Sequence, residues 1–427
     1  MGRDADGRAV SATPENDRAV AGWIRWGGPA VLAVSLSLHV IAYCIWPVYA
    51  LQIDTLVYRF GGLRVFDGLD LYSIGRNGGT VDLLFTYTPF AAVFFVPLAL
   101  ITDRIAQVLA LIVFPLLVVY VTARILRAFG LTARTGLWGL TALLVGLELW
   151  LQPIRLSIQL GQINIVILAA VVFDMLAPRQ RKWAGIAIGL VAGIKLTPAL
   201  FIVYLLLVGR VRAAIVAGAT FVATVLIGFV VLPSASLHYW IGGAFVDTKR
   251  IASDPSIGTS LQSLFERLHY PGWLATALSA VLLAASLAVA TYAYRKGQVV
   301  LGIAIVGMAS AAASPFSWSH HWVWFVPLVA HLGYRAYVLG SRLSAVMVWT
   351  TCLLFADWLT SLRGQPPAAS LLSVRLGGLW DALVPSVYVY VLVIVLVSTV
   401  IWLRRETATP PPAVIDEPVD AAPALRA

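Results

Sequence analysis

Charged residues and cysteines are both scarce in this chain. Lys, Arg, Asp and Glu make up 12% of its 427 residues, whereas hydrophobic residues make up 60%. A soluble domain does not need so much apolar sequence, so the composition excludes an ordinary globular protein and predicts an all-α, polytopic membrane protein. The two cysteines, Cys44 and Cys352, lie in apolar runs, which argues against a disulfide framework or a thiolate metal site.

Acidic residues are outnumbered, with 20 Asp and Glu against 30 Lys and Arg and a net charge of +10. A basic excess can indicate nucleic-acid binding, but here the cations gather in short segments between apolar runs, a pattern that sets membrane orientation. We therefore expect no nucleic-acid partner. Membrane lipids with phosphate groups are candidate partners for a few of these cations.

Apolar runs divide the chain into a membrane domain and two polar ends. We expect residues 1–26 and the Pro- and Ala-rich residues 405–427 to be disordered and cytoplasmic, and residues 27–404 to form one transmembrane domain. Six segments that flank the apolar runs are short and basic, so we place them in the cytoplasm: RILRAFGLTAR, PRQRK, GRVR, YRKG, YRAYVLGSR and WLRR. Membrane helices are predicted near residues 28–50, 104–123, 136–151, 158–176, 212–232, 272–294, 298–313, 321–338, 343–361 and 383–403.

Two further apolar segments do not fit simple alternation. Residues 88–101 are short and interrupted by Pro89 and Pro97, so we expect a juxtamembrane or re-entrant helix in the first outer loop. Residues 184–208 have basic segments at both ends and Lys195 in the middle. Two short helices that turn at Lys195 satisfy this pattern, and a single span with a buried lysine is the alternative. The result is about 12 crossings, with both termini in the cytoplasm.

With this topology, the unusual polar residues fall on the outer side of the membrane. Acids, amides, lysines and paired histidines are rare within hydrophobic segments and usually functional there. The sequence therefore predicts one outward-facing site. Its components are Asp54 at the end of the first helix, FTYTP (85–89, with Tyr87) in the first outer loop, SIQLGQIN (157–164) at the start of a helix, the turn at Lys195, FVDTKR (245–250) and GTSLQSL (258–264) in the outer loop 233–271, and SPFSWSHHWVW (314–324).

Each charged candidate has a chemical role available to it. Asp54 can act as a general base. Lys195 and Arg250 can neutralise a lipid phosphate. His320 and His321 can donate to phosphate oxygens or transfer protons. No Cys or third His lies at ligand spacing, so we predict no metal and no other cofactor.

The neutral candidates and the simpler alternatives complete the prediction. Gln159, Gln162 and Asn164 can bond sugar hydroxyls, although such amides also join helices to one another. Trp318, like Trp322 and Trp324, can stack on a sugar, although an interfacial belt is the commoner fate of tryptophan. Asp54 alone could cap a helix or pair with Arg59, and Lys195 could extend to the membrane surface.

Three segments together resemble glycosyltransferase family 87: LSIQLGQINIVILA, GLVAGIKLTPALFIVYLL and SPFSWSHHWVWFVP. The resemblance implies a GT-C fold and an inverting, polyprenyl-phosphate-mannose-dependent α-mannosyltransferase. Its closest likeness is to the α-(1→2) enzymes of the lipomannan, lipoarabinomannan or phosphatidylinositol-mannoside pathways. It implies Asp54 as the catalytic base and assigns Lys195 and His321 to motif positions. The stretch GTSLQSL (258–264) departs from the family pattern, which leaves Ser260 and Gln262 without roles.

The implied partners are a polyprenyl-phosphate-mannose donor and a mannan-bearing glycolipid acceptor. The implied location is the plasma membrane, with the active site on the outer, periplasmic face. A lipid-linked-sugar transporter or flippase is the main alternative, but the chain shows no internal repeat and places its polar groups at one face. A GT-C transferase of another sugar, such as arabinose, is the alternative within the enzyme class.

Overall fold

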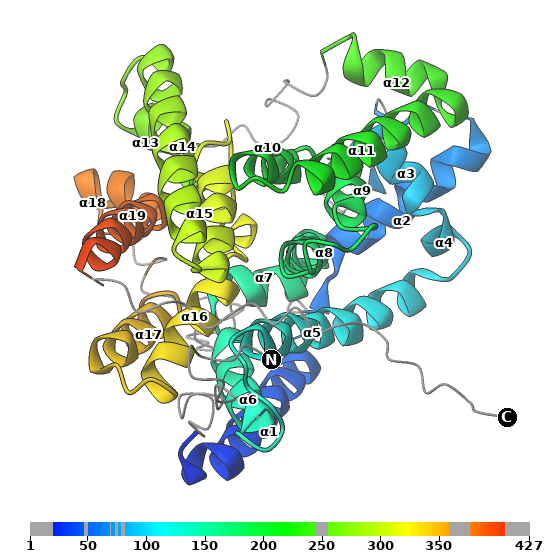
Figure 1. The fold of residues 1–427 in the computed structure, drawn as a ribbon. Coiled ribbons are helices and arrows are strands. Elements are labelled where there is room, and N and C mark those ends of the chain that lie inside the picture. Colours follow the sequence, from blue (N-terminus) through cyan, green and yellow to red (C-terminus); the bar gives the residue numbers. More distant parts are fainter. Residues whose placement is uncertain are drawn as a thin grey trace, which may run out of the picture.

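The computed structural model describes residues 20–46, 50–68, 70–72, 76–77, 82–243, 255–357, 372 and 376–405. These residues are almost entirely helical (Figure 1). One antiparallel hairpin joins β1 (Arg76–Asn77) to β2 (Asp82–Leu83). The helices of the surrounding fold are α1 (Gly22–Ile45), α5 (Asp103–Ala128), α6 (Leu137–Glu148), α11 (Val211–Val231), α12 (Pro233–Trp240), α13 (Leu261–Arg267), α14 (Gly272–Arg295), α15 (Val299–Ala312), α16 (Phe325–Tyr337), α17 (Arg342–Leu354), α18 (Gly378–Leu383) and α19 (Val387–Arg405).

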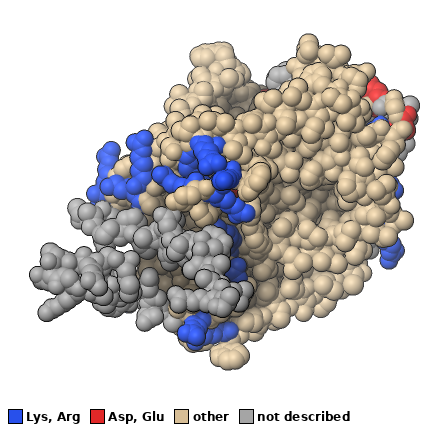
Figure 2. All heavy atoms as spheres, turned by 45° about the vertical axis from the view of Figure 1, so that its right-hand side comes forward, with Lys and Arg blue, Asp and Glu red and all other residues tan. Residues whose placement is uncertain are grey.

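Five of the described helical segments are long and apolar enough to cross a membrane: α1, α5, α11, α14 and the segment Gly378–Arg405 that contains α18 and α19. Less than half of each long apolar stretch is buried inside the protein, as expected where lipid is the solvent. In Figure 2 most of the visible Lys and Arg lie on the left-hand side, a few more lie with Asp and Glu at the right-hand edge, and the surface between them carries almost no charge. The expectation of an all-α, polytopic membrane protein is confirmed at this level.

Helices α1 and α6 lie against each other with very close backbone contact. A Cβ at Gly28 would come 2.0 Å from the carbonyl oxygen of Gly139, so a side chain is excluded there. Ser35 also donates to the carbonyl of Gly146 at 2.9 Å. Small residues of this kind let membrane helices approach closely and hydrogen-bond to one another.

The predicted span 158–176 is two helices, not one. α7 (Gln152–Leu160) and α8 (Asn164–Met175) meet at an angle of 117°. The bend lies at Gly161, which has a φ of +76° and ends α7. A Cβ at Gly161 would stand 2.0 Å from the Oγ1 of Thr55, so glycine is needed for both conformation and space. GQIN therefore forms the corner between the two helices, and its last residue, Asn164, begins α8.

The predicted break at Lys195 is confirmed. α9 (Ile186–Ile194) ends there, and Lys195 is extended, with φ −140° and ψ 133°. The chain resumes in η3 (Thr197–Ala199) and α10 (Leu200–Leu207). α9 runs alongside α11 in the same direction, because Gly185 contacts Ala213 and Gly193 contacts Thr224. Since α11 begins just after α10 ends, α10 must run back against both, and the chain reverses near Lys195.

Several helices begin or end at residues other than those predicted. The first helix ends at Ile45 and not near residue 50, so Asp54 begins a separate helix, α2 (Ile53–Asp67). The segment 88–101 contains two short helices, α3 (Pro89–Phe94) and α4 (Val96–Ala99). α16 begins at Phe325, after the short turn η6 (Ser319–His321). In Figure 1, α7, α8 and α9 lie at the centre of the fold, between α14–α15 and α2–α3.

Candidate active site

Asp54 lies in the first turn of α2, which is not among the candidate membrane spans. Tyr58 lies one helical turn later, on the same face. The preceding residue, Gln52, has a left-handed backbone with a φ of 50°, and its side chain donates to the carbonyl of Ile158 on α7. Its backbone N–H donates to the carbonyl of Gln159 at 2.9 Å. The start of α2 is therefore fixed against α7.

Gln162 connects Asp54 to the rest of the site. Its side chain hydrogen-bonds to the Asp54 carboxylate. Its Oε1 accepts from the hydroxyl of Tyr58 at 3.2 Å and from that of Tyr87 at 3.3 Å. Burial raises the pKa of Asp54 to about 7, although the bond from Gln162 and the charge of Lys195 both lower it. A carboxyl group with this pKa can accept a proton near neutral pH.

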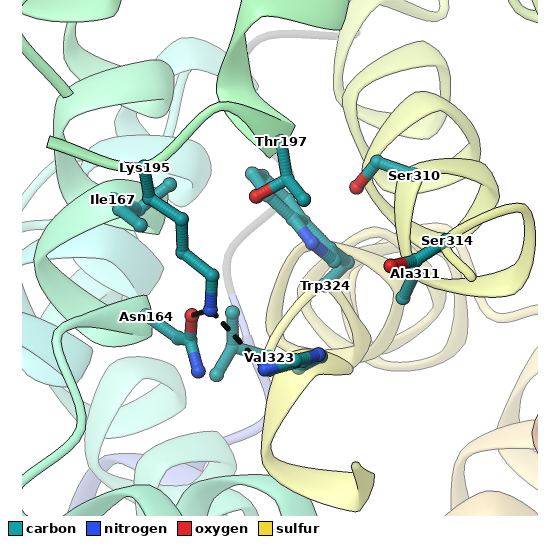
Figure 3. A pocket seen from close by; sticks show the side chains of 10 residues that line it. Asn164, Ile167, Lys195, Thr197, Ser310, Ala311, Ser314, Val323 and Trp324 are labelled. Carbon is teal, nitrogen blue, oxygen red and sulfur yellow. Dashed lines mark hydrogen bonds between the residues drawn. The ribbon is translucent and has the colours of Figure 1, made fainter. Parts of the chain in front are cut away.

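Lys195 stands at the centre of a second group of polar contacts. Its Nζ donates to Asn164 Oδ1 at 3.1 Å and lies 3.1 Å from Nε2 of His321. It also lies 5.9 Å from the centre of the Tyr87 ring. Figure 3 shows the Lys195 side chain reaching down to Asn164 within the pocket. The lysine is held in the interior of the site, so the alternative in which it extends to the membrane surface is wrong.

His321 is held on both ring nitrogens. Its Nδ1 lies 3.2 Å from the hydroxyl of Ser317. Ser317 is fixed in turn by Thr259, whose backbone N–H and hydroxyl both donate to its carbonyl, at 2.7 and 2.9 Å. When Lys195 is charged it can only donate, so His321 Nε2 is the acceptor and Nδ1 carries the proton toward Ser317. This arrangement selects one tautomer of His321.

His320 contributes to the site mainly through its backbone. Its carbonyl accepts from Asn164 Nδ2 at 3.0 Å and from the hydroxyl of Ser157 at 3.3 Å. Its buried ring stacks on Trp318, with the ring centres 5.5 Å apart and the planes 16° from parallel. The two bonds to this carbonyl fasten η6 to the corner between α7 and α8, and so place His321 opposite Lys195.

A small pocket opens beside the Lys195–His321 pair. Figure 3 shows Lys195 and Asn164 on one side of it and Trp324, Ser310 and Ser314 on the other. Asp54 is not part of its wall and is joined to it through Gln162 and Asn164. The lining consists of Asn164, Ile167, Lys195, Thr197, Ser310, Ala311, Ser314, His321, Val323 and Trp324.

Some predicted residues fall outside this group. Gln159 is not part of the pocket lining, and its Oε1 accepts from Arg155 at 2.9 Å. Trp322 and Trp324 are buried, so the alternative of an interfacial belt is wrong for both. Arg250 lies outside the described residues.

The stretch GTSLQSL has structural contacts that the sequence did not indicate. Thr259 holds Ser317, and Ser260 caps α13 by accepting from the backbone N–H of Ser263 at 3.2 Å. The amide of Gln262 donates to Glu266 at 3.1 Å on the exposed side of that helix.

Tyr58 was missed as a member of the site, and Ser317 and Thr259 lie in two of the predicted stretches but were not singled out. Only Tyr58 had a usable signal, because its spacing of four residues from Asp54 puts both on one face of a helix. Ser317 and Thr259 are neutral residues in polar stretches, where nothing in the local sequence separates a partner of histidine from an ordinary turn residue. Within the described ranges, no group of three or more His, Cys, Asp or Glu side chains is placed to hold a metal ion.

The site combines a carboxyl group able to take a proton with a cation able to hold an anion, and the imidazole of His321 holds that cation in place. The model of glycosyltransferase family 87 matches residues 85–315, which include Lys195 but neither Asp54 nor His321. Curated relatives named as polyprenol-phosphate-mannose-dependent enzymes also match. An alpha-(1-2)-phosphatidylinositol mannoside mannosyltransferase of Mycobacterium tuberculosis is 32% identical over 336 residues, which are 73% of this chain and 76% of the relative.

A second relative extends the match along the chain. An alpha-(1-2)-phosphatidylinositol pentamannoside mannosyltransferase of Mycolicibacterium smegmatis is 30% identical over 382 residues, which are 85% of this chain and 90% of the relative. No solved structure matches the chain significantly. The family model spans more than half of the chain and the relatives align with most of it, so this protein belongs to glycosyltransferase family 87.

Proposed function

We propose that this protein transfers mannose from a polyprenyl-phosphate-mannose donor to a mannan-bearing glycolipid, with inversion, to form an α-(1→2) linkage. The observation that carries the proposal is the connection of Asp54 to the Lys195–His321 pair through Gln162 and Asn164. It places a group that can accept a proton and a group that can bind an anion in one hydrogen-bonded unit. The names of the relatives supply the donor, the linkage and the acceptor class.

The proposed reaction is a single displacement at the anomeric carbon of mannose. Asp54 accepts the proton of the acceptor hydroxyl while its oxygen attacks that carbon from the face opposite the phosphate. The bond between the carbon and the phosphate oxygen breaks, and the polyprenyl phosphate leaves with the electron pair. The β-linked donor thereby gives an α-linked product. A base whose pKa is near 7 suits this role at neutral pH.

Lys195 is the proposed partner of the leaving phosphate. Two of its bonds, to Asn164 and His321, lie within the protein, and an ammonium has three donors. Its third N–H is the proposed donor to the phosphate. The phosphate gains negative charge as the glycosidic bond breaks, so a fixed cation stabilises the transition state more than the bound donor.

The proposed topology has about 12 crossings, both termini in the cytoplasm and the site on the outer face of the plasma membrane. The five long spans and the reversal of the chain near Lys195 support it. So does the group of Lys and Arg on the left-hand side of the face drawn in Figure 2. α3 and α4 are the proposed juxtamembrane segment of the first outer loop.

The test is transfer by the purified protein in lipid nanodiscs. The donor is polyprenyl-phosphate-mannose, and the acceptors are phosphatidylinositol mannosides of increasing length and lipomannan. We expect a product that loses its new mannose to an α-(1→2)-specific mannosidase. Polyprenyl-phosphate-arabinose is the matched alternative donor. Transfer of arabinose in preference to mannose, or no transfer to any acceptor, would contradict the proposal.

A further inference from the structure

The amide of Gln162 has only one orientation that satisfies its neighbours. An ionised carboxylate accepts but cannot donate, so the side of the amide that faces Asp54 must be the NH2 group. The Oε1 must then face the opposite way, where the hydroxyls of Tyr58 and Tyr87 lie at 3.2 and 3.3 Å. The oxygen of Tyr58 already accepts the backbone N–H of Ile163 at 3.1 Å, which leaves its proton free to be donated.

Asn164 repeats this arrangement on the other side of the corner. Its Nδ2 donates to the carbonyl of His320 at 3.0 Å, so its Oδ1 is turned toward Lys195 and accepts from Nζ. Its Nδ2 also lies 3.5 Å from Oε1 of Gln162. Both amides are buried, at 6% and 5% exposure, and their hydrogen-bonding groups are already used within the protein. These contacts make recognition of sugar hydroxyls a poor account of either residue.

We propose that Gln162 is a positioning residue for the transfer reaction, whose NH2 group holds the Asp54 carboxylate ionised and aimed at the acceptor hydroxyl. Tyr58 and Tyr87 keep the amide from turning over. Asn164 extends the same hydrogen-bonded unit to Lys195. The corner between α7 and α8 therefore fixes the position of the base, Asp54, relative to the cation, Lys195. This inference rests on the proposed function and specifies how its base is held.

A bond to the charged form of a carboxyl group lowers its pKa, so the proposal has a consequence for pH dependence. The titratable groups near Asp54 are Tyr58 on its own helix, Tyr87 before α3 and Lys195 after α9. On α5, Asp103 forms an ion pair with Arg59. On α7, Arg155 pairs with Asp357. Of these groups, only Lys195 shares with Gln162 the effect of lowering the pKa of Asp54.

The test compares kcat/KM for mannose transfer over about pH 5 to 9 in the wild type and in Gln162→Met. Methionine keeps the length of the side chain and removes the donor. We expect the acidic limb of the profile to move upward by about one pH unit, because the lost bond favoured the ionised base. The matched control is Gln107→Met, since Gln107 donates to the carbonyl of Leu51 at an exposed position on α5. Its acidic limb should stay at the wild-type position.

A second variant tests the same inference if Gln162→Met folds poorly. Gln162→Glu keeps the shape of the side chain but places a second carboxyl group beside Asp54, so its acidic limb should move further than that of Gln162→Met. A purely structural role would lower the yield of folded protein and leave the limb in place, and that result overturns the inference. If the wild type transfers no mannose, or if Asp54→Asn is fully active, the proposed function itself is overturned.

Discussion

Lys195 and His321 meet at 3.1 Å although 126 residues separate them in the chain. The lysine comes from the reversal between α9 and α10, and the histidine from the turn η6 before α16. Each is fixed by one further neutral partner, Asn164 for the lysine and Ser317 for the histidine. The pair is therefore held before any ligand binds, as electrostatic stabilisation of a leaving group requires.

Replacing Asp54 by asparagine should nearly abolish transfer. Asp54→Asn keeps the size of the side chain and removes its ability to accept a proton. We expect turnover per folded protein to fall by ~10²–10⁴, with folding and donor binding retained. Asp103→Asn is the control, because Asp103 forms an ion pair with Arg59 (3.0 Å) and does not line the pocket. This variant should retain most activity. Near-normal turnover in Asp54→Asn would remove Asp54 from catalysis.

Transfer should decline as the pH falls below neutrality. The pKa of Asp54 is raised by burial to about 7, and the base must be ionised to accept a proton. Below that pH the protonated fraction grows, and kcat/KM should fall about tenfold for each further unit. Above it the base is fully ionised and this dependence disappears. The measurement is kcat/KM against pH with donor and acceptor both below saturation, and a flat profile down to about pH 5 contradicts the assignment.

Loss of the cation should affect turnover more than donor affinity. Lys195→Met keeps the aliphatic stem and removes the charge, and His321→Ala removes the imidazole. We expect both to lower kcat strongly with a modest change in apparent donor affinity, because the phosphate gains its charge only as the glycosidic bond breaks. His320→Ala should have a smaller effect, since His320 acts through its backbone carbonyl. The readout is turnover per monodisperse protein, and full activity in a folded Lys195→Met, His321→Ala double variant rules out phosphate binding by this pair.

Thiol labelling can determine which side of the membrane the pocket faces. Thr197 lines the pocket, and Ser319 begins η6. A single cysteine at either position, in a background without Cys44 and Cys352, should react with an impermeant thiol reagent in intact cells. A cysteine at Arg181 is the control for the cytoplasmic side, where labelling should need permeabilisation. The reverse pattern would place the pocket in the cytoplasm.

A buried ion pair should contribute to the stability of the region behind the site. Arg155 on α7 donates through Nε to Asp357 at 2.6 Å, and their side chains are 3% and 2% exposed. Asp357→Asn leaves the buried guanidinium of Arg155 without a counter-charge, which should cost about 3–5 kcal/mol of stability. The double variant Arg155→Met, Asp357→Leu should be less destabilised, because neither charge remains. Thermal unfolding in detergent measures both, and equal stability of the wild type and Asp357→Asn contradicts the prediction.

The sequence by itself determined the class of protein and the principal charged members of the site. Long apolar runs specify membrane helices because hydrocarbon accepts few polar groups, and this rule operates segment by segment. For the same reason a lysine between two apolar stretches indicated the break that the structure has at Lys195. Asp54 and His321 were found because charge and paired imidazoles are conspicuous in such surroundings.

Only the tertiary structure decided which neutral residues serve the site. The bend at Gly161 turns Gln162 toward Asp54 and leaves Gln159 facing Arg155, and sequence spacing along one straight helix could not separate the two amides. Ser317 and Arg155 acquire their partners from distant parts of the chain. A hydrogen bond depends on positions fixed to a few tenths of an ångström, and those positions come from helix packing, which local sequence patterns do not encode.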